Sequence, residues 1–160
     1  MDLILWRHGP AQDPDTGSAD HTRELTPDGL ALVNKAANSL AYMIGKTGLP
    51  VTLWSSPLQR ARQTADILAQ NLSIPVSEHP AIAEGRLEVL AAAWQALTPH
   101  STLILVGHEP HLSQWGARIA GLLLPFSPAA AAAFTISAGL PPQGRLLWFA
   151  QAQVLAQWGQ

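Results

Sequence analysis

The sequence predicts an α/β fold, a three-layer sandwich whose mostly parallel central sheet is flanked by helices. Short runs of continuous apolar residues alternate along the chain with longer segments of helical periodicity, a pattern typical of buried parallel strands joined by helices. The 160 residues are about the length of one domain, and 48% of them are hydrophobic, which is enough for one core. Neither a repeat nor a linker interrupts the chain, so residues 1–160 are expected to form a single domain.

The chain begins with a predicted buried strand at residues 3–6, which are all apolar, followed by a turn-rich loop. Thr26 is expected to cap a first helix that starts at Pro27, because threonine accepts bonds from free backbone amides and proline suits the first helical position. Gly45 or Gly48 is expected to end this helix. Its predicted inward face consists of Leu30, Val33, Ala37, Leu40, Ala41 and Ile44.

A second strand and helix follow in the same order. Residues 51–54 are expected to form the strand, and residues 55–57, Ser-Ser-Pro, are expected to start the helix as Thr26 and Pro27 start the first one. A weak third strand is predicted within residues 74–82, although two prolines interrupt it.

The second half of the chain is expected to contain a helix over residues 86–97 and its clearest buried strand over residues 102–106. Pro110 opens a further predicted helix. Residues 134–136 and 146–149 are predicted strands joined by a turn-rich loop, which allows antiparallel pairing at the C-terminal end of the sheet.

Composition excludes several classes of protein. Nine basic against eleven acidic residues give a net charge of −2, which argues against an overall basic face for nucleic acid. No stretch is long and apolar enough for a membrane span, and the N-terminus lacks the basic region of a signal peptide, so a soluble cytoplasmic protein is expected. The absence of cysteine excludes disulfides, cysteine zinc sites and thiolate nucleophiles.

Chemistry-bearing residues follow the three best predicted strands. Arg7 and His8 come directly after the first strand. Arg60 lies six residues after the last residue of the second strand, residue 54. His108 follows the strand at residues 102–106. In parallel α/β sheets, sites form beyond the carboxyl ends of the strands. These side chains are therefore expected to converge at one edge of the sheet.

Their chemistry favours phosphoryl transfer. Arginine guanidinium groups match phosphate oxygens, and a neutral imidazole is a competent nucleophile toward phosphorus. Two arginines, a helix N-terminus and a second imidazole are expected to lower the pKa of the attacking histidine and keep it unprotonated. The residues thus predict phosphoryl transfer through a histidine, with no metal and no cofactor.

Three motifs resemble the signature of the histidine phosphatase superfamily, which has the phosphoglycerate-mutase-like fold. They are Arg-His-Gly at 7–9, Ser-Ser-Pro-Leu-Gln-Arg-Ala-Arg-Gln-Thr-Ala at 55–65 and Gly-His-Glu-Pro at 107–110. The short chain, the segment at 20–29 and the short interval between the second and third motifs are most similar to the SixA-type phosphohistidine phosphatase branch. The resemblance covers residues 3 to about 122.

The resemblance implies a role for each matching position. His8 would be the nucleophile that becomes phosphorylated, Arg7 and Arg60 would clamp the phosphoryl oxygens, and His108 would donate to the same group. Larger members also supply a carboxylate as general acid. The nearest candidate is Glu84, which either serves as that acid or is an exposed loop carboxylate. Because a protonated imidazole leaves as a neutral base, a phosphohistidine phosphatase needs no strong acid.

The remaining charged residues are assigned more simply. Arg62 points elsewhere on its helix and is expected either at the surface or behind the residues that contact the phosphate. Arg23 either lines the entrance or is solvated. A zinc helix at His108 is rejected, since Pro110 interrupts it and the His-Glu-x-x-His spacing is absent. The histidines expected to have no chemical role are His21, His79, His100 and His111.

The function that these residues favour is hydrolysis of phosphohistidine on a partner protein through a phosphorylated His8. One alternative is the same chemistry on a small phosphate ester. Another is a catalytically idle module that binds phosphate or a phosphoprotein. The lack of inserted sequence to enclose the site favours a protein-borne phosphoryl group, and the intact central positions argue against the idle module.

Overall fold

The computed structural model describes residues 1–14, 17 and 19–158, and within them it confirms the predicted α/β class. The strands are β1 (Asp2–Arg7), β2 (Val51–Ser55), β3 (Val76–Glu78), β4 (Thr102–Gly107), β5 (Ala131–Ile136) and β6 (Gly144–Ala150). The helices are α1 (Pro27–Gly45), α2 (Gln59–Leu72), α3 (Pro80–Ala83), α4 (Leu87–Trp94), α5 (His111–Ala120) and α6 (Ala152–Leu155), with a 3₁₀ turn, η1 (Asp20–Thr22).

The strands form one sheet in the order β3-β2-β4-β1-β5-β6. β1, β2, β3 and β4 are mutually parallel, whereas β5 runs antiparallel to β1 and to β6, so the predicted antiparallel pairing at the C-terminal end is confirmed. The register pairs Arg7 of β1 with Gly107 of β4, and Ser55 of β2 with Val106. The three central strands therefore end side by side, and the residues after them begin at the same edge.

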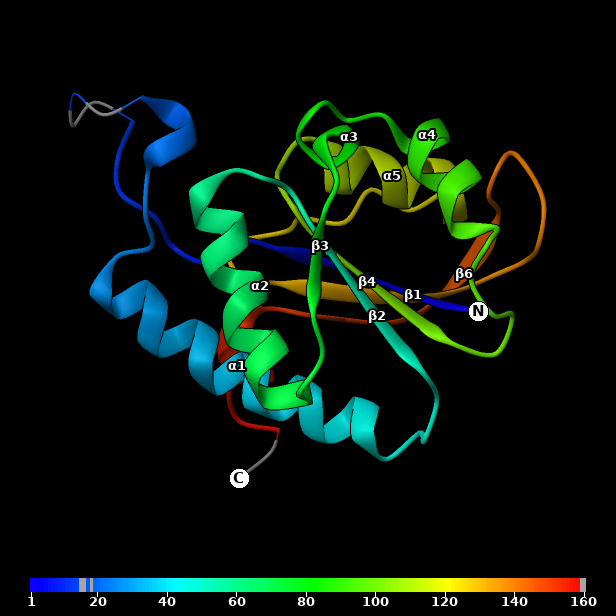
Figure 1. Cartoon of the computed structure of the whole chain (residues 1–160), viewed down its shortest axis with the longest axis horizontal. Coiled ribbons are helices and arrows are strands. Elements are labelled where there is room, and N and C mark those ends of the chain that lie inside the picture. Colours follow the sequence, from blue (N-terminus) through cyan, green and yellow to red (C-terminus); the bar gives the residue numbers. More distant parts are fainter. Residues whose placement is uncertain (15–16, 18, 159–160) are drawn as a thin grey trace.

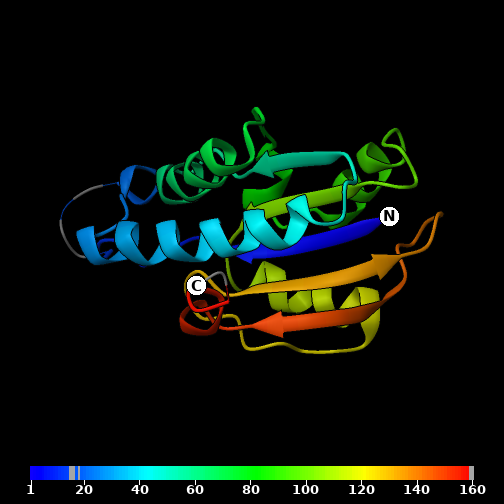
Figure 2. The same ribbon diagram turned by 90° about the horizontal axis from the view of Figure 1, so that it is seen from below.

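Helices cover both faces of the sheet (Figures 1 and 2). Along β1, Ile4 and Trp6 pack into the core under α1, α2 and α6, whereas Leu3 and Leu5 pack into the core under α3, α4 and α5. All four side chains are buried, because successive residues of a strand point to opposite faces and both faces are covered. This arrangement holds the end of β1 rigidly within the molecule.

Helix α1 begins and ends as predicted. Thr26 accepts a hydrogen bond from the Gly29 amide at 3.0 Å, and the last helical residue is Gly45. The prediction that Leu30 faces inward is wrong, because Leu30 is 39% exposed. Gly29 takes the inward position of that turn, where a Cβ atom would lie 2.1 Å from the Pro10 carbonyl oxygen.

One other local prediction is wrong. Residues 55–57 do not start α2, which begins at Gln59, because Ser55 completes β2 and the Ser56 hydroxyl contacts His108. The weak third strand predicted within residues 74–82 is confirmed as β3, Val76–Glu78, and Pro80 then occupies the first position of the short helix α3. Helix α6 near the C-terminus was not predicted.

Candidate active site

The ends of β1 and β4 bring two histidines together. The His8 amide donates to the Gly107 carbonyl at 3.0 Å, which ties the first residue after β1 to the last residue of β4. The rings of His8 and His108 lie 5.1 Å apart between centroids, and both residues are buried. The predicted convergence of the two histidines is therefore observed.

The hydrogen bonds of His8 determine which nitrogen carries the lone pair. Its Nδ1 lies 2.7 Å from the Gly9 carbonyl oxygen, and Nε2 lies 3.3 Å from Nε of Arg60. A carbonyl only accepts and a guanidinium only donates, so Nδ1 must carry the proton and Nε2 the lone pair. This tautomer makes Nε2 the nucleophilic nitrogen once a phosphoryl group draws the Arg60 N–H away from it.

Thr64 of helix α2 connects the two groups that contact the His8 ring, the Gly9 backbone and Arg60. The Gly9 amide donates to Thr64 Oγ1 at 3.1 Å, and the Thr64 hydroxyl donates to the Arg60 carbonyl at 2.8 Å. Thr64 is fully buried. Glycine is required at position 9, because a Cβ atom there would lie 2.3 Å from the Val33 side chain. The buried Thr64 hydroxyl thus connects Gly9, in the loop after β1, to Arg60 in the first turn of α2.

The surroundings keep His8 neutral. Burial lowers the pKa of His8 to about 4, the bond from its ring to the Gly9 carbonyl opposes this shift, and the positive charges of Arg60, Arg7 and Arg23 lower it further. The lowered pKa was predicted from two arginines, a helix N-terminus and a second imidazole, whereas burial is the largest cause. At neutral pH the imidazole is an uncharged base.

His108 is oriented by Ser56. The Nε2 atom of His108 lies 2.7 Å from the Ser56 hydroxyl, which itself accepts a bond from the Leu58 amide at 3.2 Å. The hydroxyl has a second lone pair, so its bond from Leu58 leaves it able to donate to Nε2 or to accept from it. We assign the hydroxyl proton to Nε2, which places the ring proton of His108 on Nδ1, the nitrogen without a partner in the described residues. Burial, followed by the charges of His8, Arg60 and His111, lowers the pKa of His108 to about 3. The ring is therefore neutral, with one N–H to donate.

Two buried nitrogens lack a partner in the part of the chain that the structure describes: Nε of Arg7 and Nδ1 of His108. Arg7 is the residue directly before His8, and its Nη1 donates to the Phe126 carbonyl at 2.7 Å. Buried donors without acceptors are costly unless a ligand satisfies them. Both nitrogens belong to residues predicted to bind phosphate, and an oxyanion that reached them would satisfy each one.

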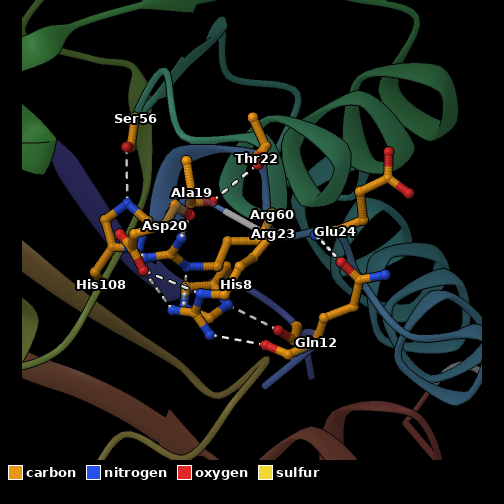
Figure 3. Close-up of polar contacts among 11 residues, drawn as sticks. His8, Gln12, Ala19, Asp20, Thr22, Arg23, Glu24, Ser56, Arg60 and His108 are labelled. Atoms are coloured by element: carbon orange, nitrogen blue, oxygen red, sulfur yellow. Dashed lines mark hydrogen bonds and ion pairs between the residues drawn. The ribbon is translucent and has the colours of Figure 1, made fainter. Parts of the chain in front are cut away.

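Asp20 contacts Arg60 as well, although no role was predicted for it from the sequence. The Arg60 guanidinium donates to the Asp20 carbonyl at 2.8 Å and to its carboxylate at 3.4 Å, and Arg23 pairs with the same carboxylate at 2.9 Å. Figure 3 shows these side chains beside His8 and His108. Of the two readings of Arg23, the structure favours the entrance-lining one, since only 15% of its side chain is exposed.

Glu84 and Arg62 lie outside the hydrogen-bond network of His8. The Glu84 side chain follows α3, is about half exposed and accepts from Arg86 at 3.1 Å. Arg62 pairs with Asp66 and Glu78, both at 2.8 Å, as expected for a surface arginine. Only one of the two arginines in this motif, Arg60, therefore contacts the histidine.

Metal ligands do not gather in the described residues. No group of three histidine or acidic side chains there is placed to hold a metal ion. Across the same residues, no helix is long and apolar enough to cross a membrane.

Comparison with known proteins identifies the family. Residues 3–117 match the model of the histidine phosphatase superfamily, branch 1. The chain belongs to this superfamily. It is also 36% identical over 129 residues to an uncharacterized protein of Picosynechococcus sp. strain PCC 7002, which spans 75% of this chain and 73% of that protein.

Solved structures confirm the phosphoglycerate-mutase-like fold of this histidine phosphatase superfamily member. The protein histidine phosphatase SixA complexed with tungstate is 22% identical, with a TM-score of 0.77, 97% of this chain covered and 99% of that one. A mycobacterial glucosyl-3-phosphoglycerate phosphatase with inorganic phosphate is 19% identical, with a TM-score of 0.71, 95% of this chain covered and 98% of that one. At these identities the likeness concerns the fold. Membership of the superfamily supports a phosphatase-type hydrolase.

Proposed function

We propose that this protein hydrolyses phosphohistidine on a partner protein through a phosphorylated His8. The observation that carries the proposal is the neutral His8, whose Nε2 lone pair faces the Arg60 guanidinium, beside the ring of His108 with its unpartnered Nδ1. Arg7, the residue before His8, adds a second buried nitrogen without a partner in the described residues. A phosphoryl group offers three acceptor oxygens and an electrophilic phosphorus, which answers both the donors and the lone pair.

The first step transfers the phosphoryl group to the enzyme. Its oxygens accept from Arg7, Arg60 and His108, which stabilise the charge that develops in transfer. The Arg60 Nε–H turns from Nε2 of His8 to a phosphoryl oxygen, which releases the lone pair. Nε2 then forms a bond to phosphorus while the bond to the leaving nitrogen breaks, and the electron pair stays on that nitrogen. When the other nitrogen of the leaving ring carries a proton, the ring departs as neutral imidazole.

The second step releases phosphate. A water molecule attacks phosphorus, the bond between phosphorus and Nε2 of His8 breaks, and the lone pair returns to Nε2. The water proton goes to a phosphate oxygen. The Nδ1 proton of His8, held by the Gly9 carbonyl, stays in place throughout and keeps the same nitrogen ready for the next cycle.

The acid–base properties of the pocket favour phosphohistidine over an alkyl ester. Burial acts to raise the pKa of Asp20, but hydrogen bonds and charges from Arg23 and Arg60 outweigh it and hold that pKa below its ordinary value. Asp20 is thus ionised, and Glu84 is exposed beside Arg86. An alkoxide leaving group needs a proton from an acid, and neither the ionised Asp20 nor the exposed Glu84 supplies one. A leaving imidazole that is already protonated on its other nitrogen needs no such acid.

The solved SixA structure, described as a protein histidine phosphatase, supports the same substrate class, and the mycobacterial glucosyl-3-phosphoglycerate phosphatase represents the small-ester alternative on a similar fold. Independence from metals and cofactors, a single domain over residues 1–160 and a cytoplasmic location remain predictions from the sequence.

Ranking kcat/KM for the purified protein on phosphohistidine peptides and on a panel of sugar phosphates tests the proposal. We expect the phosphohistidine peptides to rank first and the activity to survive EDTA. A sugar phosphate at the head of the ranking would support the small-ester alternative. Loss of activity in EDTA, restored by a divalent ion, would contradict the metal-free mechanism.

A further inference from the structure

Asp20 accepts hydrogen bonds from Arg60, the arginine that is expected to bind the phosphoryl oxygens of the substrate. Three of the five N–H groups of Arg60 make contacts, one on each nitrogen: Nε donates to His8, Nη1 to the Asp20 carbonyl and Nη2 to the Asp20 carboxylate. The carboxylate contact, at 3.4 Å, is the longest of the three. It is also the only one of them made by a negatively charged group.

The carboxylate lies at the solvent-exposed side of Arg60. Asp20 is 63% exposed, and its other oxygen pairs with Arg23, which in turn donates to the Gln12 carbonyl at 2.8 Å. The η1 turn and the loop after β1 thus present one negative charge between two arginines (Figure 3).

The charge of Asp20 acts on His108. Burial and the positive groups around His108 lower the pKa of that ring, whereas the Asp20 carboxylate acts in the opposite direction. An anion bound between Arg7, Arg60 and His108 would feel the same charge as a repulsion. A second anionic group on the same substrate, near the phosphoryl group, would feel it more strongly.

We propose that Asp20 is a specificity-determining residue whose carboxylate competes with substrate oxyanions for Arg60. The inference rests on the proposed phosphatase function of this site. Phosphate compounds with a further carboxylate or phosphate beside the phosphoryl group are disfavoured, because that group meets the Asp20 carboxylate. A leaving imidazole is favoured, because its N–H gives the carboxylate a hydrogen-bond donor or a positive charge to face.

A purely structural role predicts the opposite sign. If Asp20 serves only to hold Arg60 in place, removing its charge loosens Arg60 and weakens the binding of phosphate. If Asp20 competes for Arg60, removing its charge strengthens that binding. The Asp20→Asn variant separates the two, because it keeps the backbone carbonyl that bonds to Arg60 and changes only the carboxylate.

The matched control is Glu24→Gln, which removes the same charge from the same loop. Glu24 is exposed, and Figure 3 shows its carboxylate directed away from His8. Equal melting temperatures of the two variants and the wild type check that the fold is intact.

The first measurement is the Kd of inorganic phosphate by titration calorimetry at low and high salt. We expect Asp20→Asn to bind phosphate about twofold to tenfold more tightly at low salt, the effect of one solvent-exposed charge, and the gain to shrink at high salt. Glu24→Gln should bind as the wild type does. An unchanged or weakened affinity in Asp20→Asn, or no phosphate binding by the wild type, overturns the proposal.

The second measurement compares turnover of phenyl phosphate and 3-carboxyphenyl phosphate. Asp20→Asn should raise kcat/KM for the carboxylated compound relative to the plain one by about twofold to tenfold, and an unchanged ratio would count against the assignment. A wild type that binds phosphate and turns over no phosphate compound would refute the proposed function, while the calorimetric result would still decide the role of Asp20.

Discussion

Arg60 donates its Nε–H to Nε2 of His8 over 3.3 Å, although 52 residues separate the two in the chain. The contact joins the proposed nucleophile to the proposed phosphoryl clamp. It also orients the lone pair, because a guanidinium can only donate. The two groups are therefore expected to act on the same phosphoryl group.

Replacing Arg60 by lysine should lower kcat/KM by about 10²–10³, the usual cost of removing one donor to a transition state. Lysine keeps the charge but not the fork of donors that contacts His8 and the phosphoryl oxygens together. Arg62→Lys is the matched control, since Arg62 lies two residues away and pairs with Asp66 and Glu78 at the surface. Steady-state kinetics that fall equally in both variants would contradict the role of Arg60.

Ser56→Ala should lower kcat about tenfold, the factor that corresponds to one lost buried hydrogen bond. Without the hydroxyl, Nε2 of His108 loses its partner and the ring proton is no longer fixed on Nδ1. Ser56→Thr restores the hydroxyl and should recover most of the rate, whereas Ser77→Ala on exposed β3 should change nothing. Failure of threonine to rescue would mean that Ser56 matters for packing alone.

Glu84→Gln should change the hydrolysis of a phosphohistidine peptide little, since the leaving imidazole needs no acid. The cost on an aryl phosphate, with its good leaving group, should likewise be small. An alkyl phosphate reveals whether Glu84 is a positioned acid, in which case the loss there is about 10²–10⁴-fold. A large loss of kcat/KM on phosphohistidine would refute the acid-independent mechanism.

Stability should fall as the pH drops below about 6.5, the pKa of an ordinary histidine. Burial lowers the pKa of His8 to about 4 and that of His108 to about 3, so between these values and 6.5 the unfolded chain binds protons that the folded chain does not. Each histidine then costs about 1.4 kcal/mol of unfolding free energy per pH unit.

Urea unfolding at a series of pH values from 7.5 to 5 measures that slope. The double variant His8→Asn/His108→Asn should lose less stability over the same range, because its carboxylates are unchanged and its buried histidines are gone. Equal slopes for the double variant and the wild type would refute the assignment of neutral, buried rings.

The parts of the site that follow from topology could be predicted from the sequence. His8 and His108 come directly after apolar runs that read as parallel strands, and parallel strands end at one edge. The Thr26 cap of α1 was equally predictable, because the bond to Gly29 is local and depends only on neighbouring residues.

The parts that depend on how loops fold could not be predicted. Ser56 has the sequence context of a helix cap, yet its hydroxyl bonds to His108. Asp20 contacts Arg60 only because its part of the loop after β1 lies beside the first turn of α2, and no local sequence pattern predicts this contact. The short helix α3, Pro80–Ala83, was also not predicted, because four residues are too few to show a helical pattern.

Trapping the phosphorylated enzyme tests the central claim most directly. The protein is mixed with a phosphohistidine peptide labelled with ³²P, quenched within milliseconds under alkaline denaturing conditions, and mapped by peptide mass spectrometry. We predict a labelled phosphohistidine at His8 in the wild type, and neither label nor turnover in His8→Asn. A wild type that turns over without labelling His8, or a His8→Asn variant that keeps full activity, would contradict the covalent mechanism.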